Sequence, residues 1–148
     1  MMSAVELYGG RSEEWDTFVR GCEGWTHFQL SGWRQVIEEV FGHECPYLVA
    51  RDAKGAIEAV LPLVRVRSRL FGHYLVSMPF LNYGGPLGSP AGIRRLVDQA
   101  VEKARHDSAK LLELRSRHPL PIDLPASHRK ITVVLDLPAG EPAPLWDG

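Results

Sequence analysis

Hydrophobic and polar positions repeat along the chain with two different periods, which separate predicted helices from predicted strands. Apolar residues at i, i+3, i+4 and i+7 predict helices over residues 12–21 and 31–41. The same spacing predicts a longer helix over residues 90–105, with proline in its first turn. Ser12 and Ser89 stand where N-caps are expected. Each helix should therefore place one face in a core.

Short runs of apolar residues bounded by Gly, Pro or Asp predict the strands. Pro62 lies inside the longest run and has no N–H for a ladder, so we expect a bulge or an edge position there. The helix over residues 90–105 separates two strands, and such a crossover predicts a parallel pair within a mixed sheet. Residues 79–90 and 119–125 are expected to be loops. The predicted strands are residues 5–8, 47–50, 57–67, 73–78, 110–115 and 131–137.

The order β-α-α-β-β-β-α-β-β places the chain in the α/β (α+β) class, with a mixed central sheet and helices on both faces. A length of 148 residues predicts one domain, and a hydrophobic content of 45% argues against disorder. The sheet is expected to be truncated at its C-terminal end, since the tail after Leu137 does not close the domain.

Charge and cysteine content exclude several classes of protein. A net charge of −1 with mixed signs lacks the footprint of a duplex nucleic-acid binder. No apolar run reaches the length of a membrane span, and the first residues have no secretory signal pattern. Cys22 and Cys45 have neither zinc nor disulfide-framework spacing, which favours a cytoplasmic setting with both thiols in or near the core. The histidines show no metal-ligand spacing, so we expect no metal.

The run FQLSGWRQVIEEVFGHECPYLVARD, followed by IEAVLPLVRVRSRLFGHYLVSMPFLNYGGPLG, resembles the N-terminal half of FemAB-like proteins. It is most similar to the branch associated with exosortase and exopolysaccharide gene systems. The resemblance covers about residues 12–137 and implies a fold of the GNAT (N-acyltransferase) type. The shared features are an aromatic-x-x-x-Gly-Trp approach to the second helix, a Phe41-Gly42-His43 exit, a Leu61-Pro62-Leu63 strand and a Tyr83-Gly84-Gly85-Pro86 loop.

FemAB-like proteins have two GNAT-like halves, and members that act in cell-wall synthesis transfer amino acids from aminoacyl-tRNA to a peptidoglycan precursor. The resemblance implies that residues 1–137 are the acceptor-side domain and residues 138–148 a truncated linker toward a missing second half. The implied function is acyl or aminoacyl transfer to a peptidoglycan precursor or an exopolysaccharide-related acceptor. The implied partners are that second half, or a homodimer partner, and a small-molecule, glycan or peptide acceptor.

The donor, acyl-CoA or aminoacyl-tRNA, would then belong to the absent half, and this chain would hold no cofactor and be inactive alone. A GNAT enzyme that binds acyl-CoA needs a glycine-rich turn whose N–H groups hold the pyrophosphate at a helix start. Residues 84–88 precede a helix, but Pro86 and Pro90 remove two donors. Two alternatives stay open: an assembly module that dimerises through an open sheet edge near residues 131–137, and a small acetyl-CoA-dependent acetyltransferase.

The loop Asn82-Tyr83-Gly84-Gly85 is the first candidate for substrate binding. Two glycines allow a backbone to approach a ligand closely, and the tyrosine offers a ring face and a hydroxyl. The alternative is an ordinary turn with a half-buried tyrosine.

Charged residues on two predicted strands supply the remaining candidates, while the sequence assigns no catalytic residue. Glu113 and Arg115 can line the cleft where the two central strands of the fold separate, or form a structural ion pair. Arg65 alternates with Arg67 and Arg69 along one strand face. It can meet an acceptor phosphate or carboxylate, or belong to a solvated sheet face.

Overall fold

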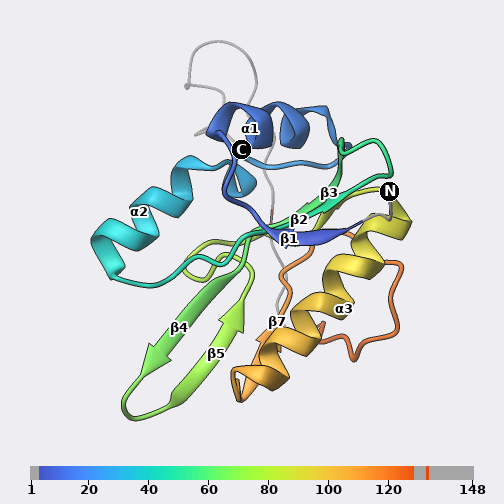
Figure 1. Cartoon of the computed structure of the whole chain (residues 1–148). Coiled ribbons are helices and arrows are strands. Elements are labelled where there is room, and N and C mark those ends of the chain that lie inside the picture. Colours follow the sequence, from blue (N-terminus) through green and yellow to red (C-terminus); the bar gives the residue numbers. More distant parts are fainter. Residues whose placement is uncertain (1–3, 129–132, 134–148) are drawn as a thin grey trace, which may run out of the picture.

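A computed structural model describes residues 4–128 and 133 of the chain, which form two sheets and three α-helices (Figure 1). The elements are β1 (Val5–Leu7), α1 (Ser12–Gly21), the 3-10 helix η1 (His27–Gln29), α2 (Gly32–Phe41), β2 (Leu48–Arg51), β3 (Ile57–Leu61), β4 (Val64–Ser68), β5 (Gly72–Val76), β6 (Leu87–Gly88), α3 (Pro90–His106) and β7 (Leu111–Glu113). The α/β class is thereby confirmed. The predicted strand over residues 131–137 falls almost entirely outside the described residues.

The two sheets are joined by the bend between β3 and β4. The first sheet is antiparallel in the order β1-β2-β3-β6, and the second has the order β4-β5-β7. The single long strand predicted over residues 57–67 is interrupted at Pro62 and Leu63, where the chain passes from one sheet to the other. Proline cannot extend the ladder of β3, which explains why the strand ends there. The predicted parallel pair is confirmed, because β7 returns beside β5 after α3.

Alternating side chains of β2 and β3 build a core on each face of the first sheet. Val49 and Val60 pack with Trp15 and Val19 of α1, while Leu61 and its neighbours pack against α3. Figure 1 shows α1 and α3 on opposite sides of this sheet, so helices cover both faces as predicted. The alternation expected from the sequence therefore sets the layers of the fold.

The helix boundaries depend on a few local interactions. Ser89 caps α3 through its Oγ, which accepts a hydrogen bond from the Gly92 N–H, and Pro90 occupies the first turn as predicted. Gly42 ends α2 in the left-handed conformation, with φ of 66°. The prediction that Ser12 caps α1 is wrong, because Ser12 is the first helical residue and Arg11 precedes it in an extended conformation.

The expectation of a simple loop over residues 79–90 is also wrong in part. Leu87 and Gly88 form the short strand β6, which pairs with Val60 and Ala59 of β3. A strand this short leaves no alternating pattern in the sequence, and here tertiary pairing alone defines it.

Candidate functional site

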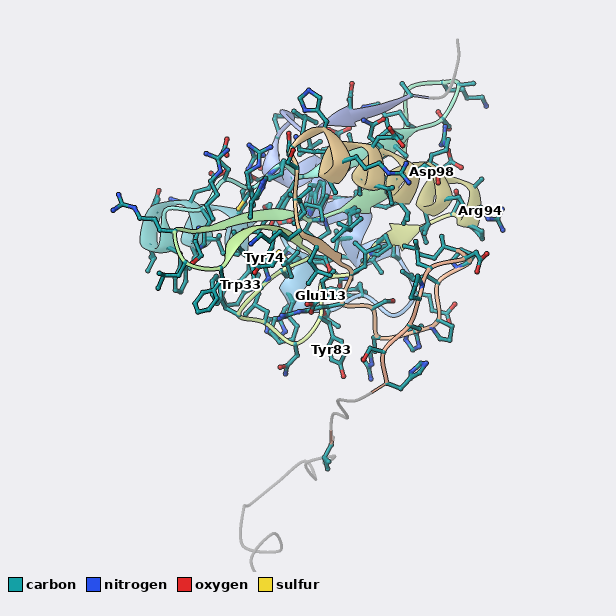
Figure 2. All side chains as sticks on the ribbon, turned by 90° about the horizontal axis from the view of Figure 1, so that it is seen from below. Trp33, Tyr74, Tyr83, Arg94, Asp98 and Glu113 are labelled. Atoms are coloured by element: carbon teal, nitrogen blue, oxygen red, sulfur yellow. The ribbon has the colours of Figure 1, made fainter. Side chains whose placement is uncertain are left out.

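The candidate site lies where the two sheets separate. After Val76 the chain leaves the parallel ladder with β7, crosses through residues 77–86, and joins the first sheet as β6. Six of the seven predicted site residues lie in this region. Four are in the crossing segment, and two are at or just after the end of β7. The seventh, Arg65, lies in β4. Figure 2 shows Tyr83 and Glu113 in this region. The six residues are Asn82, Tyr83, Gly84, Gly85, Glu113 and Arg115.

Arg115 connects the crossing to β7. Its carbonyl oxygen accepts hydrogen bonds from both Gly84 N–H and Gly85 N–H, each at 3.0 Å. Its guanidinium donates to the Leu81 carbonyl at 3.0 Å and to the Glu113 carboxylate at 2.6 Å. The predicted Glu113–Arg115 ion pair is therefore present, and its arginine also fixes the crossing loop.

The two glycines bring the crossing loop against its neighbours. A Cβ on Gly85 would lie 2.8 Å from the Ser116 Cα, and a Cβ on Gly84 would collide with the Met78 side chain. Both positions therefore need glycine for packing. Asn82 is exposed and Tyr83 is half-buried, so these two side chains form the outward rim of the loop.

Two buried polar residues that support this loop were missed by sequence reasoning. The Gln29 side-chain amide donates to the Gly85 carbonyl at 3.0 Å, while its oxygen accepts from the Thr26 N–H at 2.8 Å. The spacing Thr26-x-x-Gln29 is that of a capping box and is a signal the sequence did contain. Ser77 accepts from the Arg115 N–H at 2.7 Å, and no sequence pattern marks it.

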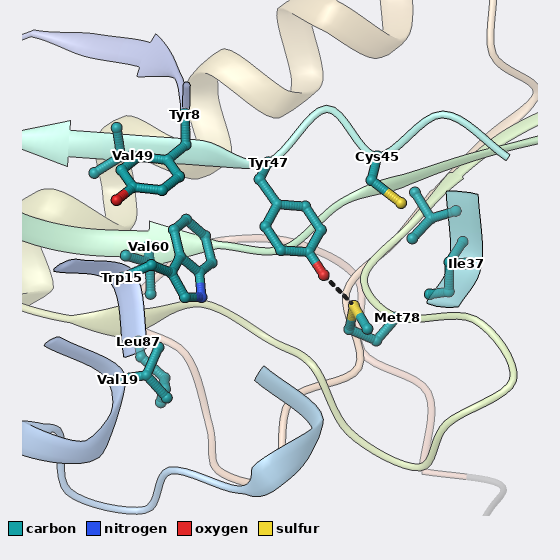
Figure 3. Close-up of a cluster of buried hydrophobic side chains, with 11 residues drawn as sticks. Tyr8, Trp15, Val19, Ile37, Cys45, Tyr47, Val49, Val60, Met78 and Leu87 are labelled. Atoms are coloured by element: carbon teal, nitrogen blue, oxygen red, sulfur yellow. Dashed lines mark hydrogen bonds between the residues drawn. The ribbon is translucent and has the colours of Figure 1, made fainter. Parts of the chain in front are cut away.

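The loop is also anchored in the core beneath it. Met78 has a φ of 53°, which is uncommon for a residue with a side chain, and its sulfur accepts a hydrogen bond from the Tyr47 hydroxyl at 3.3 Å (Figure 3). Burial raises the pKa of the Tyr47 hydroxyl, which favours the protonated form that donates this hydrogen bond. The loop is thus connected to the buried core through Met78.

An exposed aromatic stack adjoins the loop on the side of α2. Phe80 stacks on Phe41 with ring centroids 4.7 Å apart, and His43 lies 6.0 Å from Phe80 on a nearly parallel plane. The apolar stripe of α2 was expected to face the core, but only Ile37 is buried and Val40 is 71% exposed. Among the described residues nothing covers the outer part of this stripe.

The start of α3 is where a GNAT donor pyrophosphate would be held, and its residues do not fit that group. Pro90 has no N–H, and the Gly92 N–H already donates to the Ser89 Oγ. The Glu58 carboxylate lies at the same place, where it accepts from the Ser89 Oγ at 2.5 Å and pairs with Arg95. An internal anion therefore occupies the favourable end of the helix dipole.

Arg65 lies away from the other candidates, near the C-terminal end of α3. Its guanidinium pairs with Asp107 and with Glu44, and its side chain is mostly buried. Burial alone would raise the pKa of Asp107, but hydrogen bonds from His106 and Lys103 and the nearby charges of Lys103 and Arg65 outweigh it. The resulting pKa is about 2.

Asp107 should make the stability of the protein depend on pH in acid. Its carboxyl is more acidic in the folded state than in the unfolded chain, so its contribution is complete above about pH 4 and is lost toward about pH 2. The expected loss is about 2 kcal/mol, measured by urea unfolding at a series of pH values. Asp107→Asn should flatten the curve in this window, whereas Asp98→Asn, at an exposed position of α3, should not. If the unfolding free energy of Asp107→Asn fell with pH as steeply as that of the unchanged protein, Asp107 would not be the source of this acid dependence.

Neither cysteine has the features of a nucleophile. Burial raises the pKa of Cys22, and burial with the nearby Glu38 charge raises that of Cys45 to about 12. Residues 4–128 contain no group of three His, Cys, Asp or Glu side chains able to hold a metal ion. No helix in the described part of the chain has both the length and the apolar character needed to cross a membrane.

Comparison with solved structures identifies the architecture. A GNAT family acetyltransferase from Staphylococcus aureus aligns with a TM-score of 0.53 and 11% identity, over 90% of this chain and 100% of that one. A transcriptional regulator from Bacillus halodurans aligns with a TM-score of 0.56 and 12% identity, over the same shares. No protein-family model matches the chain, and no curated protein matches it in sequence. The fold is GNAT-like, as the strand order and the parallel β5–β7 pair also indicate.

Proposed function

We propose that the chain is the acceptor-side GNAT-like domain of a FemAB-like N-acyltransferase or aminoacyltransferase, with its donor site in a second GNAT-like half. The observation that carries this proposal is the Glu58 carboxylate at the start of α3, hydrogen-bonded to Ser89 and paired with Arg95. A donor pyrophosphate would have to displace this internal anion. Two of the N–H groups that could bind it are not available, because Pro90 has none and the Gly92 N–H donates to the Ser89 side chain.

The crossing loop supports the same division of roles. In the GNAT fold the separated central strands form a cleft, and here residues 77–86 lie against the end of β7, with hydrogen bonds to Arg115 and Glu113. What remains accessible is the rim, with Asn82 and Tyr83 beside the charged Glu113–Arg115 pair. A ring face, an amide and two opposite charges suit a polar acceptor such as a glycan or peptide of the cell envelope.

The exposed stripe of α2 supports a partner domain. Val36, Val40 and Phe41 extend from the helix, and Phe80 continues the apolar surface through its stack on Phe41. Exposed apolar patches of this kind mark interaction surfaces. The second GNAT-like half is the occupant that the proposed function requires.

The acceptor role can be tested by backbone NMR with a soluble muropeptide as the probe. Binding should shift the amide signals of residues 82–85 and 113–116, which surround the rim. Tyr83→Ala should weaken binding about thirtyfold, since an aromatic contact contributes roughly 1 kcal/mol and a hydroxyl hydrogen bond a similar amount. Tyr83→Phe retains the ring, so it should lose only the part of the binding free energy that the hydroxyl hydrogen bond contributes.

The matched control is Lys54→Ala, in the exposed turn between β2 and β3. This variant should bind the muropeptide as the unchanged chain does. Shifts confined to other surfaces, or equal affinities in Tyr83→Ala and the unchanged chain, would contradict the assigned acceptor site. Association of the chain with itself and no response to the muropeptide would favour the assembly module instead.

A further inference from the structure

The β4–β5 hairpin extends from the body of the protein and ends in two exposed apolar side chains. Leu70 is 85% exposed and Phe71 is 66% exposed at its tip. Figure 1 shows this tip and the C-terminal end of α3 at the same lower end of the molecule. The exposed Leu111, at the start of β7, pairs with Tyr74 of the hairpin and adds to the apolar surface.

The tip is held in this outward conformation by hydrogen bonds. The Ser68 Oγ accepts from the Leu70 N–H at 3.3 Å and from the Phe71 N–H at 3.2 Å. The Phe71 carbonyl accepts from the Tyr74 hydroxyl and, at 3.3 Å, from the Lys110 ammonium. Because the backbone is fixed, the two apolar side chains are presented to their surroundings by the turn itself.

Positive charge surrounds this apolar tip. The segments around the tip carry a formal net charge of +3, although the whole chain has a net charge of −1. They contain six basic and three acidic residues, counted over residues 64–73, residues 102–110 and Glu44. Asp107 is only 14% exposed and is already paired with Arg65 and Lys103. Arg67, Arg69 and Lys110 are exposed close to the tip. The protein is therefore polarised, with its basic end at the hairpin.

We propose that the hairpin tip docks on an anionic membrane surface. Leu70 and Phe71 would enter the interface between headgroups and acyl chains, while Arg67, Arg69 and Lys110 contact lipid phosphates with their long side chains. A protein partner is less suited to this feature, since two apolar side chains fall far short of the roughly 800 Å² per partner of a stable interface. Docking through the hairpin does not require the proposed transferase activity.

Sedimentation with lipid vesicles tests this proposal on the full chain. Vesicles of phosphatidylcholine with phosphatidylglycerol should bind the protein, and vesicles of phosphatidylcholine alone should bind it much more weakly. The double variant Arg67→Gln, Arg69→Gln should bind these vesicles roughly thirtyfold more weakly, because each basic residue near an anionic surface raises the affinity about fivefold. Leu70→Ser with Phe71→Ser should weaken it at least about tenfold.

Two controls separate docking from general effects. Val40→Ser removes an apolar side chain of greater exposure than Phe71 from α2, and Arg20→Gln removes a basic charge from α1; neither should alter vesicle binding. Unchanged binding in both hairpin variants, or equal binding to neutral vesicles, would overturn the proposal. A dimer that is lost in Leu70→Ser with Phe71→Ser, without vesicle binding, would overturn it in favour of self-association.

Discussion

Gly88→Ala should destabilise the protein by more than about 3 kcal/mol, because it forces both a backbone clash and a disfavoured conformation. Gly88 has a φ of 128°, a region that residues with side chains rarely adopt. A Cβ would lie 2.5 Å from the Ala59 Cα and closer still to the Glu58 carbonyl oxygen. Both obstacles are backbone atoms of β3, so they cannot rotate away. Urea unfolding measures the loss.

Gly42→Ala is the matched control. Gly42 also has a positive φ, but a Cβ there would meet nothing within 4 Å. Its substitution should cost only the conformational penalty of about 1–2 kcal/mol. Equal losses of unfolding free energy in Gly42→Ala and Gly88→Ala would contradict the close approach of β6 to β3, with which the crossing loop ends.

Trp15→Ala should cost about 3–5 kcal/mol, the usual range for removing a large aromatic side chain from a core. Trp15 is fully buried between the rings of Tyr8 and Tyr47, with centroids 5.1 and 5.0 Å away. Its indole N–H donates to the Gln29 carbonyl at 2.8 Å, and the substitution leaves that buried carbonyl without its partner. Thermal or urea unfolding gives the loss directly.

The same substitution has an expected effect at the site. Gln29 holds the Gly85 carbonyl, so loosening the 3-10 helix η1 should increase hydrogen exchange at the Gly84 and Gly85 amides. Trp25→Ala is the control, because Trp25 is 37% exposed and should cost less than about 1 kcal/mol without altering these amides. Unchanged exchange in Trp15→Ala would contradict the link between the core and the loop.

The parts of the fold that sequence predicted well were those in which independent local signals agreed. The helix α3 had a serine cap, a proline in its first turn and a long apolar stripe, and its position between two strands also predicted the parallel β5–β7 pair. The pair Leu87–Gly88 has no comparable local signal, because its strand character comes only from β3. Local pattern therefore predicted the elements that local chemistry stabilises.

The candidate site was less predictable for a related reason. The glycine loop and the Glu113–Arg115 strand were identified separately, and the sequence did not indicate that Arg115 would bond the loop backbone. Arg65 was grouped with them by its charge, although Asp107 and Glu44 engage it elsewhere. The stripe of α2 predicted a buried face, but periodicity reports amphipathicity and does not reveal whether the covering surface belongs to the same domain.

Thermal unfolding with and without acetyl-CoA tests most directly our proposal that this GNAT-like domain does not hold the donor. A ligand at one hundred times its dissociation constant would add about 2.7 kcal/mol, equivalent to a rise of about 5–10 °C for a domain of this size. We expect no change in the midpoint of unfolding, since Glu58 and Pro90 leave the start of α3 unsuited to a pyrophosphate. A rise of several degrees that saturates with acetyl-CoA would contradict it and place a donor site within this chain.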